Sequence, residues 1–462
     1  MATAPSAPGN ATRASAALAD VSLDELLLKV RSQIHRQSPK ESSNEFFPLE
    51  PATFAEANLS DGFVEGLLLK YMLSCGTATG RQCADQVAMP FKLIDELMLQ
   101  MKTDQLVVYR GSAMMNDYTY QLTDMGRERA RRLAEHCTYY GSAPVTLKEY
   151  VDSVHRQSLT TQHPTIDEVR KAFDDLLMSE KTLRRLGPAI NSGRGLFLFG
   201  APGNGKSSIA ERITRAFGSS IWIPKAIGID GEVIRLFDPS NHEVVPMEKS
   251  DGLLDKQQID RRWLRIRRPT IIVGGELTMS ALEVTLNTST GVSEAPIQLK
   301  SNCGTLVIDD FGRQRMPIDE LLNRWIVPLE QRHDYLNLPN GKKIQVPFDQ
   351  LIVFSTNLEP RDLVDDAFLR RIPYKIEVVD PSEDDFRRLF ETMALKLGVE
   401  YRADALDYLL EKHYRSCNRP LRCCQPRDLL MQVRNLCVFM GQPPVMSPEY
   451  LDIAVETYFA IM

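Results

Sequence analysis

The sequence predicts an α/β fold built on a parallel sheet, followed by a helical C-terminal region. Three observations favour this class. A short apolar run, 196–199, leads through a glycine-rich turn into a segment with apolar residues at helical spacing, 209–217. Two further apolar runs, 304–308 and 350–354, each end in polar side chains. From residue 381 onward, apolar residues recur mainly with helical periodicity.

The bulk composition is that of a globular protein. Of the 462 residues, 43% are hydrophobic and 25% are charged, which excludes a disordered or membrane-embedded class. The net charge of −6 means that any contact with nucleic acid must come from a local patch. The eight cysteines are scattered, as in a reducing compartment, so we expect a cytoplasmic protein. No apolar run approaches transmembrane length, so we expect no membrane partner.

The chain is long enough for several domains, and changes in composition predict their limits. The first twenty residues are rich in Ala, Ser and Thr and lack the apolar centre of a signal peptide. The roughly hundred residues from Lys206 to Asp309 exceed what a βαβ unit needs, so this interval must hold an insertion. The expected regions are 1–58, a disordered tail with a short helix at 21–31 and a linker; 59–140, a small α+β domain; 141–380, the sheet core with an insertion at about 225–300; and 381–462, a helical domain.

The region 59–140 resembles a winged helix in the order of its elements. We expect helices at 63–73, 81–88 and 91–101, strands at 106–109 and 118–122, and a closing helix at 124–135. A winged helix that reads DNA usually presents basic and amide groups from its third helix. Here the basic cluster lies on the closing helix instead, which favours a solvated face or a protein contact over specific DNA reading. The cluster consists of Arg127, Arg129, Arg131 and Arg132.

The glycine-rich turn matches the phosphate-binding P-loop, G-x-x-x-x-G-K-[ST], at every required position. Its glycines let backbone N–H groups wrap a phosphate chain at the positive end of the following helix. Lys206 would reach the β- and γ-phosphates, and the Ser207 hydroxyl would take a Mg²⁺ position. The candidate binding residues are Gly200, Ala201, Pro202, Gly203, Asn204, Gly205, Lys206, Ser207 and Ser208.

Two polar strand ends supply the remaining chemistry. In a parallel sheet they would meet the P-loop at the carboxyl edge. Asp309 would hold Mg²⁺ through water, and Asp310 would polarise the attacking water. Asn357, with Thr356 beside it, would orient that water near the γ-phosphate.

This order of motifs resembles the AAA+ ATPase superfamily, from about residue 165 to the end of the chain. The resemblance implies a P-loop core with a C-terminal helical lid, ATP and Mg²⁺ as cofactors, and a homo-oligomeric ring, with a hexamer as the expected count. Asn357 matches the sensor 1 position. Arg370 and Arg371 match the segment that carries the arginine finger, without a choice between them. Arg427 matches the sensor 2 arginine of the lid.

Two other segments indicate which branch of the superfamily the chain resembles. The lead-in at 294–306 and a hairpin expected at 335–346 are similar to the branch that contains MoxR-like chaperones, sigma-54-dependent activators and magnesium chelatase subunits. The GAFTGA loop of the sigma-54 activators is absent, which counts against that activity. Asp309 and Asp310 match the Walker B position of the superfamily. That position usually has Asp-Glu, whereas this chain has Asp310 in place of Glu.

The expected insertion carries two features of its own. A hairpin is expected around Asp230-Gly231. A basic run surrounds Trp263, and it is interpreted either as the lining of a ring pore that grips an acidic or nucleic-acid substrate, or as a solvated surface or subunit contact. The run consists of Arg261, Arg262, Arg265, Arg267 and Arg268.

These observations favour one function and leave two alternatives open. The favoured function is Mg²⁺-dependent ATP hydrolysis by an oligomer that remodels a still unidentified protein partner, as in the MoxR-like branch. The first alternative is a DNA-linked ATPase or transcriptional regulator that binds DNA through the winged-helix-like domain. The second is a nucleotide-gated scaffold that turns ATP over very slowly.

Overall fold

The computed structural model describes residues 46–246 and 259–460, which fall within one compact unit, Phe46–Met462. The helix expected at 21–31 lies outside the described residues. Among the described residues, no helix is both long enough and apolar enough to cross a membrane.

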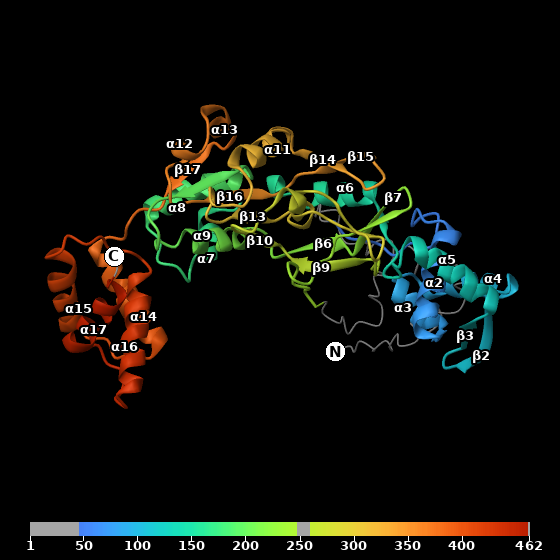
Figure 1. Ribbon diagram of the computed structural model, residues 1–462, viewed down its shortest axis with the longest axis horizontal. Helices are drawn as coiled ribbons and strands as arrows, with labels where there is room; N and C mark the ends of the chain where they lie inside the picture. The colour runs from blue at the N-terminus through green and yellow to red at the C-terminus, as the bar shows by residue number, and fades with distance from the viewer. Residues whose placement is uncertain (1–45, 247–258, 461–462) are drawn as a thin grey trace, which may run out of the picture. The chain divides into compact units, whose positions relative to one another are not determined.

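The centre of the fold is a five-stranded sheet in which every neighbouring pair is parallel (Figure 1). Its three central strands are short runs made mostly of Val, Ile, Leu and Phe and buried on both faces, as is typical of parallel sheets, whereas each edge strand carries exposed residues. The P-loop strand lies between two other strands, so its carboxyl end is flanked on both sides. In spatial order the strands are β10 (Thr270–Val273), β13 (Thr305–Ile308), β16 (Leu351–Ser355), β5 (Leu196–Phe199) and β17 (Tyr374–Glu377).

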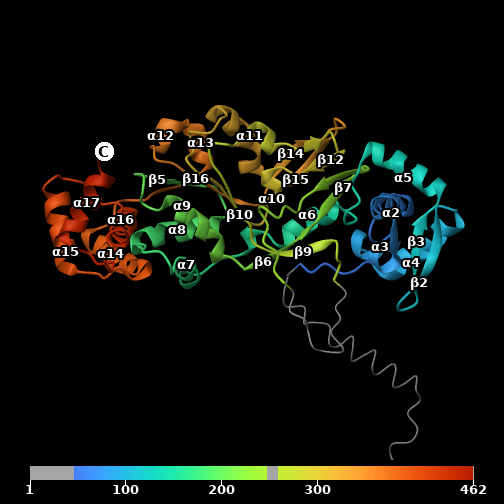
Figure 2. The ribbon, with the colours of Figure 1, turned by 60° about the horizontal axis from the view of Figure 1, so that its bottom comes forward.

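Helices cover both faces of this sheet (Figure 2). Successive side chains of a strand point to opposite faces, so Leu196 and Leu198 enter one hydrophobic cluster and Phe197 the other. The fold class expected from the sequence, a parallel sheet flanked by helices with a helical C-terminal region, is therefore confirmed. The first cluster is covered by α7 (Ile166–Ala172), α8 (Glu180–Ser192) and α9 (Lys206–Ile213), and the second by α11 (Ile318–Gln331) and α13 (Asp366–Arg371), with α12 (Pro360–Leu363) just before α13.

The sequence predicts one helix over 165–178, which begins with a capping box at Thr165–Glu168, and it does not predict α8. In the structure α7 ends at Ala172, and α8 begins after the cap Ser179, whose hydroxyl accepts a hydrogen bond from the N–H of Thr182. The cap, the apolar spacing and the left-handed Gly193 at its end are the usual signals of a helix, and they were available in the sequence.

Two small sheets fill most of the interval between the P-loop and Asp309. The core strand β10 also lies in this interval, so the insertion consists of two segments on either side of it. Helices α6 (Leu147–Arg156) and α10 (Ile297–Lys300) accompany these sheets. The larger sheet has the order β11 (Thr285–Asn287), β12 (Val292–Glu294), β8 (Glu232–Arg235), β7 (Ala226–Ile229) and β4 (Val145–Thr146); the smaller pairs β6 (Ser220–Pro224) with β9 (Trp263–Arg267).

Both hairpins expected in the core region are confirmed. Strands β7 and β8 pair antiparallel across Asp230 and Gly231, which have φ of 51° and 86°. Two positive φ values are what a type I′ turn requires, and Asp-Gly is one of its preferred pairs. The second hairpin joins β14 (His333–Asn337) to β15 (Lys343–Pro347).

The basic run of the insertion has a structural role that neither interpretation anticipated. Arg262 is 2% exposed and donates to the Asp260 carboxylate and to the carbonyls of Ala57 and Pro144. Arg268 is also buried and donates to backbone carbonyls, among them Cys303 O at 2.6 Å. For these two arginines both a pore lining and a solvated surface are wrong, because their guanidinium groups satisfy buried acceptors.

The N-terminal part forms its own hydrophobic cluster around four helices and a three-stranded antiparallel sheet. The Asp117 carboxylate is buried and accepts the N–H groups of Gly80 and Arg81, which caps the start of one helix from a strand. The loop expected at 110–117 is shorter, because the strand before it continues to Ala113. The elements are α2 (Asp61–Cys75), β1 (Thr77–Thr79), α3 (Gly80–Val87), α4 (Phe91–Thr103), β2 (Val107–Ala113), β3 (Asp117–Leu122) and α5 (Asp124–His136).

Residues 46–52, expected to belong to a linker, are packed against the insertion. The Phe46 ring lies 5.0 Å from the Trp263 ring, and Leu49 pairs with Ile259 in an antiparallel bridge. The C-terminal region is a helical cluster with its own buried core, as expected. Its helices are α14 (Glu383–Leu397), α15 (Ala403–Leu409), α16 (Gln425–Phe439) and α17 (Pro448–Tyr458).

Candidate nucleotide site

The P-loop backbone has conformations that glycine provides at low cost. Gly200 has φ of 129°, and a Cβ there would lie 2.6 Å from the carbonyl oxygen of Val378 on the neighbouring strand end. Gly203 has φ of 84°, and a Cβ there would lie 2.6 Å from Cys424 Sγ. Helix α9 then begins at Lys206 with no side-chain cap, so its first N–H groups are available to an anion.

Lys206 is held in place by three acceptors. Its ammonium donates to the carbonyl oxygens of Gly200 and Ala201, each at 2.9 Å, and to Asn357 Oδ1 at 2.7 Å. The side chain is 7% exposed. Burial lowers the pKa of Lys206 below the usual lysine value, while the nearby carboxylates of Asp309 and Asp310 act in the opposite direction.

The two candidate Mg²⁺ residues are in contact. The Ser207 hydroxyl donates to Asp309 Oδ2 at 2.7 Å. A hydroxyl and a carboxylate oxygen are the ligand types that Mg²⁺ prefers in proteins, so this pair fits that ion. Asp309 reaches this position because it follows β13, whose last residue, Ile308, pairs with Phe354 of β16.

Asn357 connects the lysine to the second carboxylate. Its Oδ1 accepts from Lys206, and its Nδ2 donates to Asp310 Oδ1 at 3.2 Å. Asp310 has φ of 48°, a left-handed conformation that is uncommon outside glycine. Its amide donates to the neighbouring carboxylate oxygen Asp309 Oδ1 at 3.1 Å. The three motifs expected from the sequence thus form one continuous polar network.

A cavity of about 490 Å³ lies over this network. Gly200 and Ala201 are absent from its lining and contribute carbonyl groups to Lys206 instead. The sequence reasoning missed the apolar part of the lining, because it comes from segments remote in the chain. The expected residues that line the cavity are Pro202, Gly203, Asn204, Gly205, Lys206, Ser207, Ser208, Asp309, Asp310, Asn357 and Arg427; the missed ones include Leu176, Leu177, Met178, Leu389, Met393, Cys423 and Cys424.

Comparison with known proteins gives a matched domain of unknown function and distant structural likenesses. A family model described as a domain of unknown function, DUF8689, matches residues 382–457. The sequence matches no curated protein. Among solved structures, the chain is similar to the Thermotoga maritima RuvB Holliday junction branch migration motor, with 14% identity, 63% of this chain and 73% of that chain covered, and a TM-score of 0.36.

A second likeness is to NtrX from Brucella abortus, with 14% identity, 62% of this chain covered and a TM-score of 0.40. The chain spans 56% of the length of that protein. Similarity at this level says nothing about the activity of the chain. Its activity is inferred below from its own motifs and sheet order.

The C-terminal region contacts the P-loop directly. The amide of Cys424 donates to Gly203 O at 2.8 Å, and Asn204 Nδ2 donates to Asp380 Oδ1 at 2.6 Å. Asp380 also pairs with Arg422. Arg427 lines the cavity, but its guanidinium is paired with Asp428 Oδ1 at 2.9 Å. The Asp380 contacts had no motif signal in the sequence.

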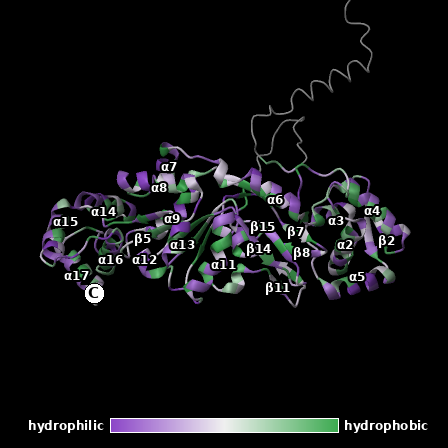
Figure 3. Ribbon diagram, turned by 90° about the horizontal axis from the view of Figure 1, so that it is seen from above, coloured by the Kyte–Doolittle hydropathy of each residue, from purple (hydrophilic) through white to green (hydrophobic). Residues whose placement is uncertain are grey.

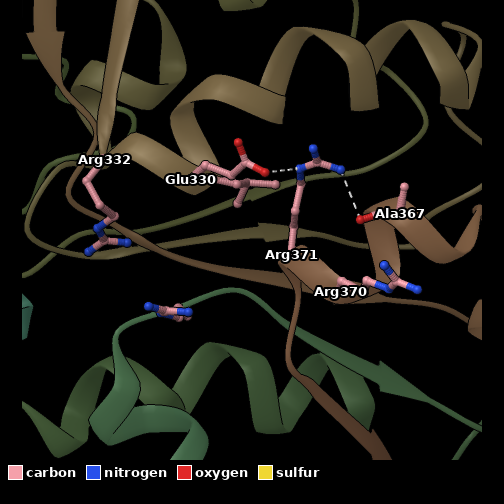
Figure 4. Close-up of a pocket in the computed structure, with 7 residues that line it drawn as sticks. Glu330, Arg332, Ala367, Arg370 and Arg371 are labelled. Atoms are coloured by element: carbon pink, nitrogen blue, oxygen red, sulfur yellow. Dashed lines mark hydrogen bonds and ion pairs between the residues drawn. The ribbon is translucent and has the colours of Figure 1, made fainter.

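The two candidate finger arginines lie apart from the P-loop cavity. Arg370 and Arg371 line a different cavity of about 420 Å³ (Figure 4). Arg371 Nε donates to Glu330 Oε1 at 2.7 Å, and its Nη1 donates to Ala367 O at 2.9 Å. The structure therefore brings together the P-loop, Asp309, Asp310, Asn357 and Arg427, but neither candidate finger.

Proposed function

We propose that this chain is a Mg²⁺-dependent ATPase. The observation that carries the proposal is the continuous network from Lys206 through Asn357 to Asp310, beside the Ser207–Asp309 pair, in a single cavity. A cation, an amide and two carboxylates at the end of a P-loop are the groups that phosphoryl transfer to water needs.

The residues divide the reaction between them. Lys206 and the N–H groups of the P-loop bind the phosphates, and Ser207 with Asp309 holds Mg²⁺, which when bound offsets charge on the phosphate oxygens. Asp310 accepts a hydrogen bond from the attacking water, and Asn357 orients that water. The water oxygen bonds to the γ-phosphorus, the bond from that phosphorus to the β,γ-bridging oxygen breaks, and ADP leaves. The water's proton passes to Asp310 or on to the released phosphate.

An oligomer completes the site in this proposal. Because Arg370 and Arg371 line a cavity that shares no residue with the P-loop cavity, a second copy of the chain is needed to supply the arginine. Head-to-tail contacts of this kind form a ring when the rotation between neighbouring copies closes, and a ring is the assembly proposed here. A hexamer remains the expected count. Arg427 would contact the γ-phosphate on leaving its pairing with Asp428.

Remodelling of a protein partner, as in the MoxR-like branch, is the favoured use of this activity. Helix α5, the hydrophilic helix of the winged-helix-like region (Figure 3), offers little free positive charge to DNA, because most of its arginines are paired with carboxylates. The pairs are Arg127–Asp124, Arg129–Glu65 and Arg132–Glu128.

The DNA-linked alternative is tested by gel shift of the full chain over a range of salt concentrations. If the chain remodels a protein partner, the wild type should retain no more DNA at low salt than a variant that carries both Arg127→Gln and Arg131→Gln. Retention that is lost in this variant and falls steeply with salt would favour the DNA-linked ATPase.

The slow nucleotide-gated scaffold is the remaining alternative. It is favoured by one observation, the carboxylate at position 310, which is one methylene shorter than Glu and is already engaged by Asn357. In that case ATP would bind normally and turnover would be no faster than in variants that lack the network.

ATP binding tests the proposal at its first step. We expect a fluorescent ATP analogue to bind the full chain in the presence of Mg²⁺, and Lys206→Ala to weaken binding by a factor on the order of 100, the value of one charge-assisted contact. Lys181→Ala, which removes an exposed lysine on α8, serves as the matched control and should stay within about twofold of wild type. Equal affinity of the Lys206→Ala and wild-type proteins would contradict the proposal.

The lowered pKa of Lys206 predicts a pH dependence of that affinity. A polyanion binds the protonated lysine better, so affinity should fall as pH rises through the pKa of Lys206, which lies below the usual lysine range. The dissociation constant is measured between about pH 8 and about pH 10.5, where the phosphates of ATP are already fully ionised. Lys206→Arg keeps its charge throughout and should give a flat profile; an equally steep profile would contradict this assignment.

A further inference from the structure

The cavity that holds Arg370 and Arg371 contains four arginines and a single carboxylate. It has a volume of about 420 Å³, and three separate segments build it: the residues before β5, the end of α11, and α13. Figure 4 shows Glu330 and Arg332, at the end of α11, and Arg370 and Arg371, of α13, around this cavity. The lining residues are Arg194, Leu329, Glu330, Arg332, Ala367, Arg370 and Arg371.

Two of the four arginines are fixed by the fold. Arg332 donates to Gly193 O at 2.9 Å and to Asp349 Oδ1 at 3.0 Å, which ties the end of α11 to the loop before the P-loop strand. Arg371 is fixed by Glu330 and by Ala367 O. Each of these two guanidinium groups is paired with a carboxylate and also donates to a backbone carbonyl.

The other two arginines lack such acceptors within the part of the chain that the structure describes. Among residues 46–246 and 259–460 the structure records no hydrogen bond or ion pair for the side chains of Arg194 and Arg370, and both residues are exposed. Two guanidinium groups without acceptors in one cavity repel one another unless an anion is present. Guanidinium forks match the paired oxygens of phosphate groups, so a phosphate-bearing ligand fits this arrangement.

We infer that Arg194 acts together with Arg370 as an anion-contacting pair for the terminal phosphates of a nucleoside triphosphate that a second copy of this chain holds in its P-loop. The inference rests on the proposed function and extends it to a residue outside the motifs. A second copy is assigned as the holder of the nucleotide because, among the described residues, none lines both this cavity and the P-loop cavity.

The position of Arg194 gives the pair a further consequence. Arg194 lies two residues before β5, the strand that ends in the P-loop of its own chain, and Arg332 donates to the carbonyl of the preceding residue, Gly193. A phosphate contact at Arg194 therefore bears on the same strand that positions Lys206.

Mixed assemblies test the inference. Arg194→Ala should leave binding of the fluorescent ATP analogue within about twofold of wild type and lower ATP hydrolysis by a factor on the order of ten or more, the value of a hydrogen bond to a charged group. Arg194→Lys keeps the charge but lacks the guanidinium fork, so its rate of ATP hydrolysis should fall between those of the wild type and Arg194→Ala. Arg185→Ala, which removes an exposed arginine of α8, is the matched control and should hydrolyse ATP at the wild-type rate.

An equimolar mixture of the Arg194→Ala and Lys206→Ala proteins should recover hydrolysis. One protein retains a working P-loop and the other retains the arginine cavity, so about one interface in four of a randomly mixed ring is complete. Activity of the mixture above the sum of its parts supports the inference.

Three results would overturn it: wild-type hydrolysis by the Arg194→Ala protein, loss of its own ATP binding, or no recovery in the mixture. Recovery of hydrolysis in a mixture of the Arg370→Ala and Lys206→Ala proteins, but not in a mixture of the Arg194→Ala and Lys206→Ala proteins, would assign the contact with the second copy's nucleotide to Arg370 alone. Failure of the proposed function has a different signature, because the wild type itself would then hydrolyse ATP no faster than Lys206→Ala.

Discussion

Replacing Arg370 with alanine should lower ATP hydrolysis by about a thousandfold while leaving ATP binding nearly unchanged. A guanidinium that meets the transferred phosphoryl group offsets charge that develops in the transition state, and such an arginine is worth about 10³-fold or more in turnover. Arg370 is the candidate because no acceptor within the described residues holds its side chain, whereas Arg371 is bound to Glu330 and Ala367. Steady-state hydrolysis and equilibrium binding of the same protein preparation measure the two effects.

Arg371→Ala is the matched comparison on the same helix. Its removal breaks the contact between α13 and the end of α11, so we expect a smaller loss, on the order of tenfold. Glu330→Gln, which leaves both arginines in place, should have a similar or smaller effect. A larger loss in Arg371→Ala than in Arg370→Ala would reverse the assignment and make Glu330 a partner that releases Arg371 during turnover.

Replacing Arg262 with methionine should lower the free energy of unfolding by about 3–5 kcal/mol. Arg262 and Asp260 are each 2% exposed, and the arginine also donates to Ala57 O and Pro144 O. Its removal would leave the Asp260 carboxylate buried without its partner and two carbonyls without a donor, which is the costly way to break a buried pair. Denaturant unfolding followed by tryptophan fluorescence measures the change, since Trp263 is adjacent in the chain.

The control is Arg267→Met. Arg267 lies at the end of β9, the strand that follows Arg262, and its side chain is 68% exposed. Its ion pair with Glu243 lies at the surface, where such pairs contribute less than about 1 kcal/mol. Asp260→Leu combined with Arg262→Met should recover part of the loss, because no unpaired charge then remains. Equal effects of the Arg262 and Arg267 substitutions would show that the buried pair does not stabilise this region.

The polar network could be predicted from the sequence because it depends on strand order along the chain. Lys206, Asp309 and Asn357 each follow an apolar run, and the carboxyl ends of parallel strands share one edge of a sheet. Their roles in catalysis stay predictions, but their proximity is now a structural fact.

The remaining features depend on contacts between segments far apart in the chain. The burial of Arg262, in contrast to the exposure of Arg267, has no local signal in the sequence, because the carbonyls that accept from Arg262, those of Ala57 and Pro144, lie more than a hundred residues away. The same holds for Arg194, which became a candidate only when the fold placed it in the lining of the same cavity as Arg370. In contrast, α8 carried its cap and periodicity in the sequence and was simply missed.

The central claim is that the network of Lys206, Asn357 and Asp310 hydrolyses ATP. Its most direct test is steady-state ATP hydrolysis by the full chain with Mg²⁺, at a protein concentration that promotes assembly, beside the Lys206→Ala and Asp310→Asn proteins. We predict clear turnover by the wild type, background rates for both variants, and retained ATP binding by Asp310→Asn, which keeps the lysine and the P-loop intact. A wild-type rate no higher than that of the two variants would contradict the account.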